Sequence, residues 1–190
     1  SIQSLFAPAE EFVTLSFNPQ ASEQGLWTLE TYRKLIASLL KRDMKQSVLL
    51  TELNKLDYLS RFHSVYTTRA LPSLKRLQEK WEGQDISVEI IDKIAGLYQS
   101  HLWELSGSDS LKRAAAAKDL YDLLRSYISS FPGYERISAL ENRLRQLTQP
   151  QYTVSGEKTF PIKGKKRWKI QYKNLVSLNA TLYRIDSPTE

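Results

Sequence analysis

The sequence predicts a mainly α-helical protein that ends in a short antiparallel β segment. Two observations lead to this fold class. Apolar residues recur at helical spacing through most of residues 28–149. After Pro150 the period changes, and every second residue of a short stretch becomes apolar. We therefore expect an antiparallel array of helix pairs followed by a C-terminal β-hairpin.

The chain is expected to have three parts. Residues 1–27 form a lead-in that contains two prolines, and its segment 11–17 fits either a strand or the end of a short helix. Residues 28–149 form the helical domain. Residues 150–190 form the β segment.

Three helices are expected in the first half of the helical domain. The first begins at Thr28, which can serve as its N-cap. The second spans about residues 46–62. The third spans about residues 68–81, which places Pro72 in its first turn, where the missing N–H costs little. Gly83 ends this third helix.

Three more helices follow, separated by a Ser-Gly-Ser-Asp loop and a Phe-Pro-Gly-Tyr break. The fourth helix begins at Asp85 or Ser87. The fifth spans about residues 110–130. The sixth begins near Ile137 and stops before Pro150.

The β segment contains one clear strand at residues 168–173, where Trp, Ile and Tyr alternate with polar residues. A second strand is expected at residues 179–185, with Asn174 as the turn residue. Residues 151–154 and 158–162 are weaker extended candidates. Because so few strands seldom make an independent sheet, this tail is predicted to open a larger β domain.

The helical part also resembles tetratricopeptide-type repeats. Ala116, Leu120 and Pro132 occupy places typical of the second helix of such a unit, where a small residue admits the partner helix. Gly96 and Tyr98 would belong to its first helix. Gly96, however, lies too close to Ala116 for a regular 34-residue repeat. A degenerate helix-pair array and an ordinary helical bundle both remain open.

Composition excludes several classes of protein. The 190 residues suit one domain, or one domain plus a fragment of another, and a hydrophobic fraction of 41% is enough to bury a core. No apolar run approaches the roughly 18–20 residues that a membrane helix needs. The N-terminal residues lack the basic-then-apolar pattern of a signal segment. The absence of cysteine excludes disulfide scaffolds, thiolate metal sites and thiol catalysis.

The net charge of +6 is concentrated in one short stretch. Residues 1–156 hold 19 basic and 18 acidic residues, so they are nearly neutral. Residues 157–173 hold seven basic residues and one acidic residue, Glu157. The basic residues of this stretch that are candidate polyanion contacts are Lys163, Lys165, Lys166, Arg167 and Lys169.

Two interpretations of the basic stretch compete. In the first, the basic side chains neutralise phosphates while Trp168 or Tyr172 stacks on bases. In the second, the lysines are the solvated face of a strand, where they also discourage edge-to-edge aggregation. The alternation puts aromatic residues on one face and lysines on the other, whereas a stacking platform needs both on one surface. The second interpretation is therefore favoured, and nucleic acid is not expected as a partner.

No constellation typical of catalysis is visible. The two histidines, His63 and His101, have no partners at metal-ligand spacing. The sequence also lacks a Gly-x-Ser-x-Gly motif and a phosphate-binding glycine loop. We therefore predict no catalytic, cofactor-binding or metal-binding residues, and we expect that this chain is not an enzyme.

Four segments together resemble large bacterial alpha-2-macroglobulin-like proteins. In one subgroup of that family, degenerate helical repeats lead directly into a macroglobulin-type β domain. The matching segments are residues 47–59 (SVLLTELNKLDYL), 127–133 (YISSFPG), 168–175 (WKIQYKNL) and 182–186 (LYRID). The last two are similar to the opening β-hairpin of that domain.

This resemblance implies a structural or interaction module within a larger, protease-trapping type of protein of the cell envelope or periplasm. Its partners would be other domains of the same protein and, through that protein, proteases. The family's bait region is not present here, and a thioester is impossible without cysteine, so no functional residue is transferred. The alternative function is a helical scaffold whose basic hairpin binds nucleic acid or another polyanion.

Overall fold

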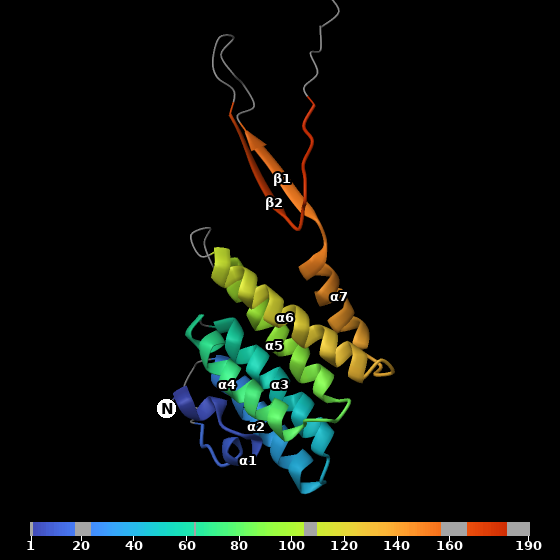
Figure 1. Ribbon diagram of the computed structural model, residues 1–190. Coiled ribbons are helices and arrows are strands. Elements are labelled where there is room, and N and C mark those ends of the chain that lie inside the picture. Colours follow the sequence, from blue (N-terminus) through green and yellow to red (C-terminus); the bar gives the residue numbers. More distant parts are fainter. Residues whose placement is uncertain (1, 18–23, 63, 105–109, 157–166, 182–190) are drawn as a thin grey trace, which may run out of the picture. The chain divides into compact units, whose positions relative to one another are not determined.

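The computed structural model describes residues 2–17, 24–62, 64–104, 110–156 and 167–181 (Figure 1). The chain is mainly helical and carries a short two-stranded antiparallel sheet toward its C-terminal end. The predicted fold class is therefore confirmed.

The chain divides into two compact units, Ser1–Leu144 and Arg145–Glu190. The helices are η1 (Ile2–Phe6), α1 (Ala9–Phe12), α2 (Gln24–Lys41), α3 (Lys45–Phe62), α4 (Ser64–Lys80), α5 (Ser87–Glu104), α6 (Ser110–Ser130) and α7 (Ile137–Thr148). The strands are β1 (Gln151–Gly156) and β2 (Trp168–Lys173). The boundary between the units falls within α7, so the second unit contains the end of α7 and the hairpin.

The six expected helices correspond to α2 through α7, and two details of the prediction were wrong. Thr28 is not an N-cap, because α2 already begins at Gln24. Tyr58 on α3 donates a hydrogen bond of 3.4 Å to the carbonyl of Gly25 and so ties this extra turn to the array. Pro72 is not in a first turn either, because α4 begins at Ser64 and Pro72 lies in its interior. Because proline has no backbone N–H, Pro72 cannot donate the helical hydrogen bond to the carbonyl four residues earlier.

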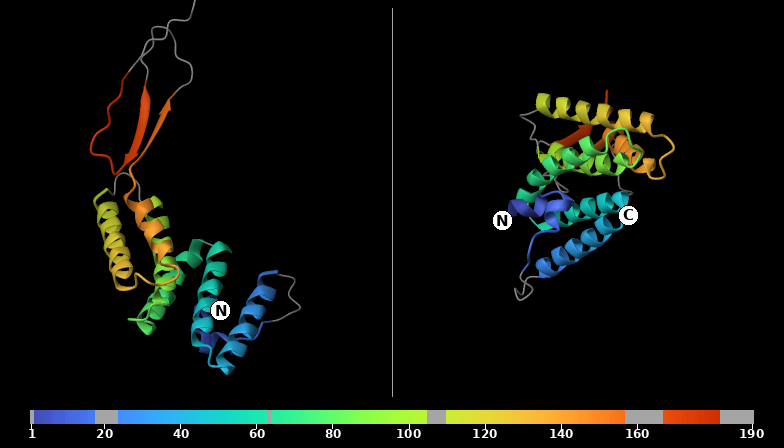
Figure 2. Two further views of the ribbon diagram at one scale, coloured as in Figure 1. Left: turned by 90° about the vertical axis from the view of Figure 1, so that its right-hand side faces the viewer. Right: turned by 90° about the horizontal axis from the view of Figure 1, so that it is seen from below.

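Successive helices of the first unit pack side by side, from α2 against α3 to α5 against α6 (Figures 1 and 2). Ion pairs also join alternate helices: Asp57 on α3 binds Lys93 on α5, and Asp92 on α5 binds Arg143 on α7. Arg143 also donates to Gln99, which lies about two turns after Asp92 on α5. The side-by-side order and these links between alternate helices are typical of a helix-pair array.

The core of the first unit consists of the helical stripes that the spacing predicts. Four of the five leucines of α3, namely Leu49, Leu53, Leu56 and Leu59, are buried. The same holds for the isoleucines of α5 and for Leu120 and Leu124 of α6. In the run of four alanines on α6, Ala114 and Ala115 are exposed and therefore do not belong to this core.

The lead-in packs onto the helices and adds to their core. Its undecided segment belongs to the end of a short helix, since α1 ends at Phe12 and no strand follows within residues 13–17. Phe6, Ala9 and Phe12 are buried. The η1 helix contacts α4, and α1 contacts α2.

In the second unit, β2 forms where the alternation predicts it, but its partner differs from the prediction. It pairs antiparallel with β1, one of the weaker candidates. Residues 179–181 are not in a strand, and residues 182–185 and 158–162 lie outside the described residues. Tyr152 faces Tyr172 and Val154 faces Ile170 across the pair, so matching apolar residues select this register.

Asn174 is the turn residue after β2, as the sequence predicts. This residue has a φ of 55°, in the left-handed region that asparagine tolerates. Its side-chain amide donates to the carbonyls of Leu147 at 2.7 Å and Gln149 at 3.3 Å. The chain bends at Asn174 beside the end of α7, and residues 175–181 then run back along the hairpin without forming a strand (Figure 1).

Candidate functional site

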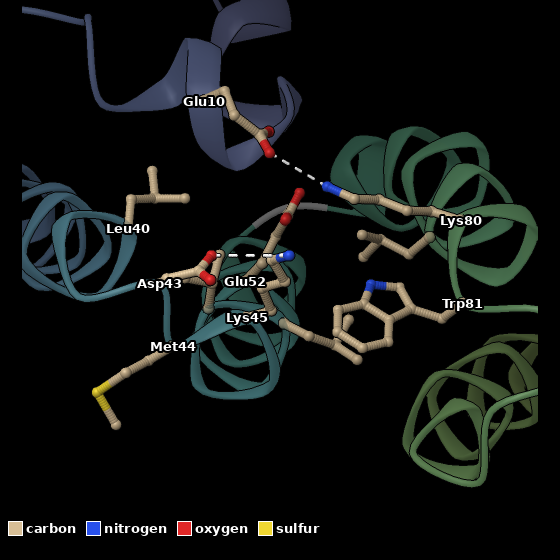
Figure 3. Close-up of a pocket in the computed structure, with 11 residues that line it drawn as sticks. Glu10, Leu40, Asp43, Met44, Lys45, Glu52, Lys80 and Trp81 are labelled. Atoms are coloured by element: carbon tan, nitrogen blue, oxygen red, sulfur yellow. Dashed lines mark hydrogen bonds and ion pairs between the residues drawn. The ribbon is translucent and has the colours of Figure 1, made fainter.

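A pocket of about 360 Å³ lies in the first unit among α1, the α2–α3 turn, α3 and α4 (Figure 3). Its apolar lining comes from Leu40, Met44, Val48, Leu49, Leu77 and Trp81. Its charged lining comes from Glu10, Asp43, Lys45, Glu52 and Lys80. This volume falls within the range of roughly 300–1,000 Å³ that is common for small-molecule sites.

Two ion pairs lie at this pocket. Lys80 on α4 lies 3.1 Å from Glu10 on α1, and Lys45 lies 3.7 Å from Asp43 in the α2–α3 turn. All four side chains are more than half exposed, so each pair contributes little to stability. Their charges nevertheless cancel in pairs around the pocket.

Glu52 on α3 is the buried polar group of the pocket, with only 3% of its surface exposed. Its carboxylate points toward the Glu10–Lys80 pair (Figure 3). Its Oε1 lies 3.8 Å from Nη2 of Arg76, which is too long for a hydrogen bond. This oxygen is buried without a hydrogen-bond partner among the described residues. Burial raises the pKa of Glu52, although Lys55 and Arg76 oppose this effect.

Lys55 lies one helical turn after Glu52 and is fully buried. Its ammonium donates to the carbonyl of Ala7 at 3.2 Å and lies 4.0 Å from the ring centroid of Phe12, a cation–π contact. Desolvation lowers the pKa of Lys55 from 10.5 to about 8, an effect that Glu52 partly offsets. The buried ammonium thus ties the lead-in to α3.

Two side chains of α4 hold the same segment. Ser73 donates to the carbonyl of Phe6 at 2.8 Å, and Arg76 donates to the same oxygen at 3.4 Å. Together with Lys55, these contacts fix η1 and α1 against the helices. The wall of the pocket that carries Glu10 is therefore held by buried polar contacts.

The pocket and its buried acceptor were missed from the sequence, although a signal was present. Glu52 and Lys55 fall among the apolar positions of α3, next in order to Leu49, Leu53 and Leu56. A charged residue on the buried stripe of a helix needs a partner from another element. This pattern could have identified Glu52 and Lys55 as buried charged residues with partners on other elements.

The predicted polyanion contacts are described only in part. Arg167 and Lys169 are exposed, whereas Lys163, Lys165 and Lys166 lie outside the described residues. Lys169 is opposite Ser155 and Trp168 is opposite Gly156 in the register, so the lysine and the tryptophan point to opposite faces. The described part of the basic stretch therefore does not combine charge and stacking on one surface.

The apolar face of the hairpin is a second candidate binding surface. Its side chains are exposed by 39–68% and are Tyr152, Val154, Trp168, Ile170 and Tyr172. The opposite face carries polar residues only, because Gln151, Thr153 and Ser155 face Lys173, Gln171 and Lys169. The sheet is thus strongly two-sided.

No family model, curated protein or solved structure matches this sequence. Within the described residues, no cluster of three or more histidine and acidic side chains is placed to hold a metal ion. His63 lies outside those residues, and His101 belongs to the last turn of α5. None of the described helices is both long and apolar enough to cross a membrane.

Proposed function

We propose that this chain is a non-catalytic interaction module of a larger alpha-2-macroglobulin-like protein of the cell envelope. In this proposal the hairpin docks on another domain of the same protein. The observation that supports it is the exposed apolar face of β1 and β2. The resemblance in sequence suggests the parent family, and through it the periplasmic location and the link to proteases.

The physical argument rests on the instability of a bare hairpin. An isolated two-stranded hairpin is marginal in water, and a sheet needs a third strand or a packed face to be stable. Full burial of a large apolar side chain contributes about 1.5–3 kcal/mol. Tyr152, Trp168 and Tyr172 are still more than half exposed. Covering these side chains with a neighbouring β domain would supply the missing stabilisation.

The test compares the chain in isolation with the same residues inside the full reading frame of its parent. Amide hydrogen exchange of β1 and β2 is expected to slow strongly in the parent, because docking protects the strand hydrogen bonds. Equal exchange rates in both proteins would contradict the proposal. Cell fractionation of the parent checks the envelope location separately.

Two matched substitutions identify the face involved. Ile170→Thr alters the apolar face and Gln171→Thr alters the polar face, and both introduce a residue with high β propensity. We expect only Ile170→Thr to reduce protection in the parent. Salt-sensitive binding of an oligonucleotide that weakens on Lys169→Ala would instead favour the polyanion alternative.

A further inference from the structure

We propose that the pocket among α1, α3 and α4 binds a small neutral molecule with an apolar body and one hydroxyl or amide N–H group, which donates to Glu52. This site is independent of the hairpin and of the proposed function. The observation behind it is a buried carboxylate oxygen without a hydrogen-bond partner, placed in the lining of an otherwise mostly apolar pocket.

The unpartnered oxygen indicates what the ligand must supply. A buried acceptor without a donor costs about 1–3 kcal/mol, and more when it is charged. Arg76 relieves this cost only in part, since its Nη2 forms an ion pair with Glu52 Oε1 at 3.8 Å, too far for a hydrogen bond, and donates instead to the carbonyl of Phe6. A ligand O–H or N–H that enters the pocket would complete the hydrogen bonding of Glu52.

The walls indicate the body of the ligand. Leucine, methionine and valine side chains from α2, the α2–α3 turn, α3 and α4 line the space, and Trp81 closes one side of it (Figure 3). Such surfaces favour an aliphatic or aromatic group. A single polar head on a compact apolar body matches one buried acceptor among apolar walls.

The surrounding charges favour a neutral ligand. Glu10 is paired with Lys80 and Asp43 with Lys45, so neither pair leaves a free charge. An added ammonium would lie beside Arg76 and the buried Lys55, whereas an added carboxylate would meet Glu52 itself. Bringing in either charge would therefore cost more free energy than bringing in a neutral donor.

The experiment uses two isomeric probes, 1-hexanol and methyl pentyl ether, which have the same atoms but differ in the hydroxyl donor. Binding to the full chain is followed by NMR from the indole N–H signal of Trp81, assigned with the variant Trp81→Phe. The measurement is made at about pH 8 to favour the carboxylate form of Glu52, which accepts the hydroxyl, because burial raises the pKa of this group above its ordinary value. We expect 1-hexanol to bind about tenfold more tightly than the ether, as a hydrogen bond to a charged group predicts.

Variants of Glu52 connect this preference to one side chain. Glu52→Leu should abolish the preference, because no acceptor remains. Glu52→Gln keeps the shape but can turn an N–H toward the ether oxygen, so the preference should fall to about threefold or less. Glu79→Gln alters an exposed carboxylate of α4 that does not line the pocket and should leave the tenfold preference unchanged.

Several results would overturn the proposal. Equal affinity of the native chain for the two isomers would show that no donor is recognised. An unshifted Trp81 signal would show that neither probe enters the pocket. Tighter binding of hexylammonium than of 1-hexanol would refute a neutral ligand. If Glu52→Leu fails to fold, an unchanged preference in Glu52→Gln refutes the role of Glu52.

Discussion

Among single residues, Lys55 shows how a charge can be accommodated inside a helical core. Its ammonium has no exposed surface, yet it has a carbonyl acceptor in Ala7 and an aromatic face in Phe12. Such contacts offset part of the desolvation cost that a buried charge carries. Lys55 therefore acts as an anchor for the lead-in, which packing alone would hold less specifically.

Replacing Lys55 is expected to change how stability depends on pH. The folded state lowers the pKa of Lys55 from 10.5 to about 8, so it releases this proton more readily than the unfolded state. The native chain should therefore gain stability relative to Lys55→Met as the pH rises from about 8 toward 10. Urea unfolding of both proteins at several pH values measures this difference.

Lys75→Met is the control for this comparison, because Lys75 is an exposed residue of α4. Its stability should stay parallel to that of the native chain across the same pH range. Parallel curves for the native chain and Lys55→Met would mean that the buried ammonium does not titrate as expected.

At the scale of the elements, the loops between helices contain two glycines, Gly83 and Gly133, that differ in backbone conformation. Gly83 follows α4 with a φ of 74°, a conformation that side chains with a Cβ rarely adopt. Gly133, in the break between α6 and α7, does not have a positive φ. A Cβ at either position would have open space around it. Only the backbone conformation distinguishes them.

This difference predicts opposite outcomes for two identical changes. Gly83→Ala should lower the free energy of unfolding by about 1 kcal/mol, because alanine is strained in the left-handed region. Gly133→Ala should be neutral or slightly stabilising, because it restricts the unfolded chain without strain. Thermal unfolding followed by circular dichroism compares them. Equal destabilisation by both would contradict the assignment of strain to Gly83.

For the whole molecule, the main feature is the division into two compact units. The first has its own core, formed by successive helices, and polar anchors that hold the lead-in. The second consists of the end of α7 and a hairpin whose apolar face is exposed. The stability of the chain is therefore expected to reside in the helices.

A truncation tests this division. A chain cut after residue 149 should keep a cooperative thermal transition within a few degrees of that of the native chain, since the helices and their core are intact. A cut after residue 120 is the contrasting case, because it removes the fully buried Leu124 and Leu140. That chain should lose the transition. Loss of the transition in the longer chain as well would show that the helices depend on the hairpin.

The sequence by itself determined the helices and the two-sided nature of β2, because both follow from the local spacing of apolar residues. Only the tertiary structure decided that β1 is the partner of β2 and that a pocket forms around Glu52. These features depend on contacts between distant residues, such as Lys55 with Ala7 or Lys80 with Glu10, which lies 70 positions earlier. Local periodicity carries no information on such pairs. It therefore could not predict that Lys55 binds the lead-in or that Glu52 lines a pocket.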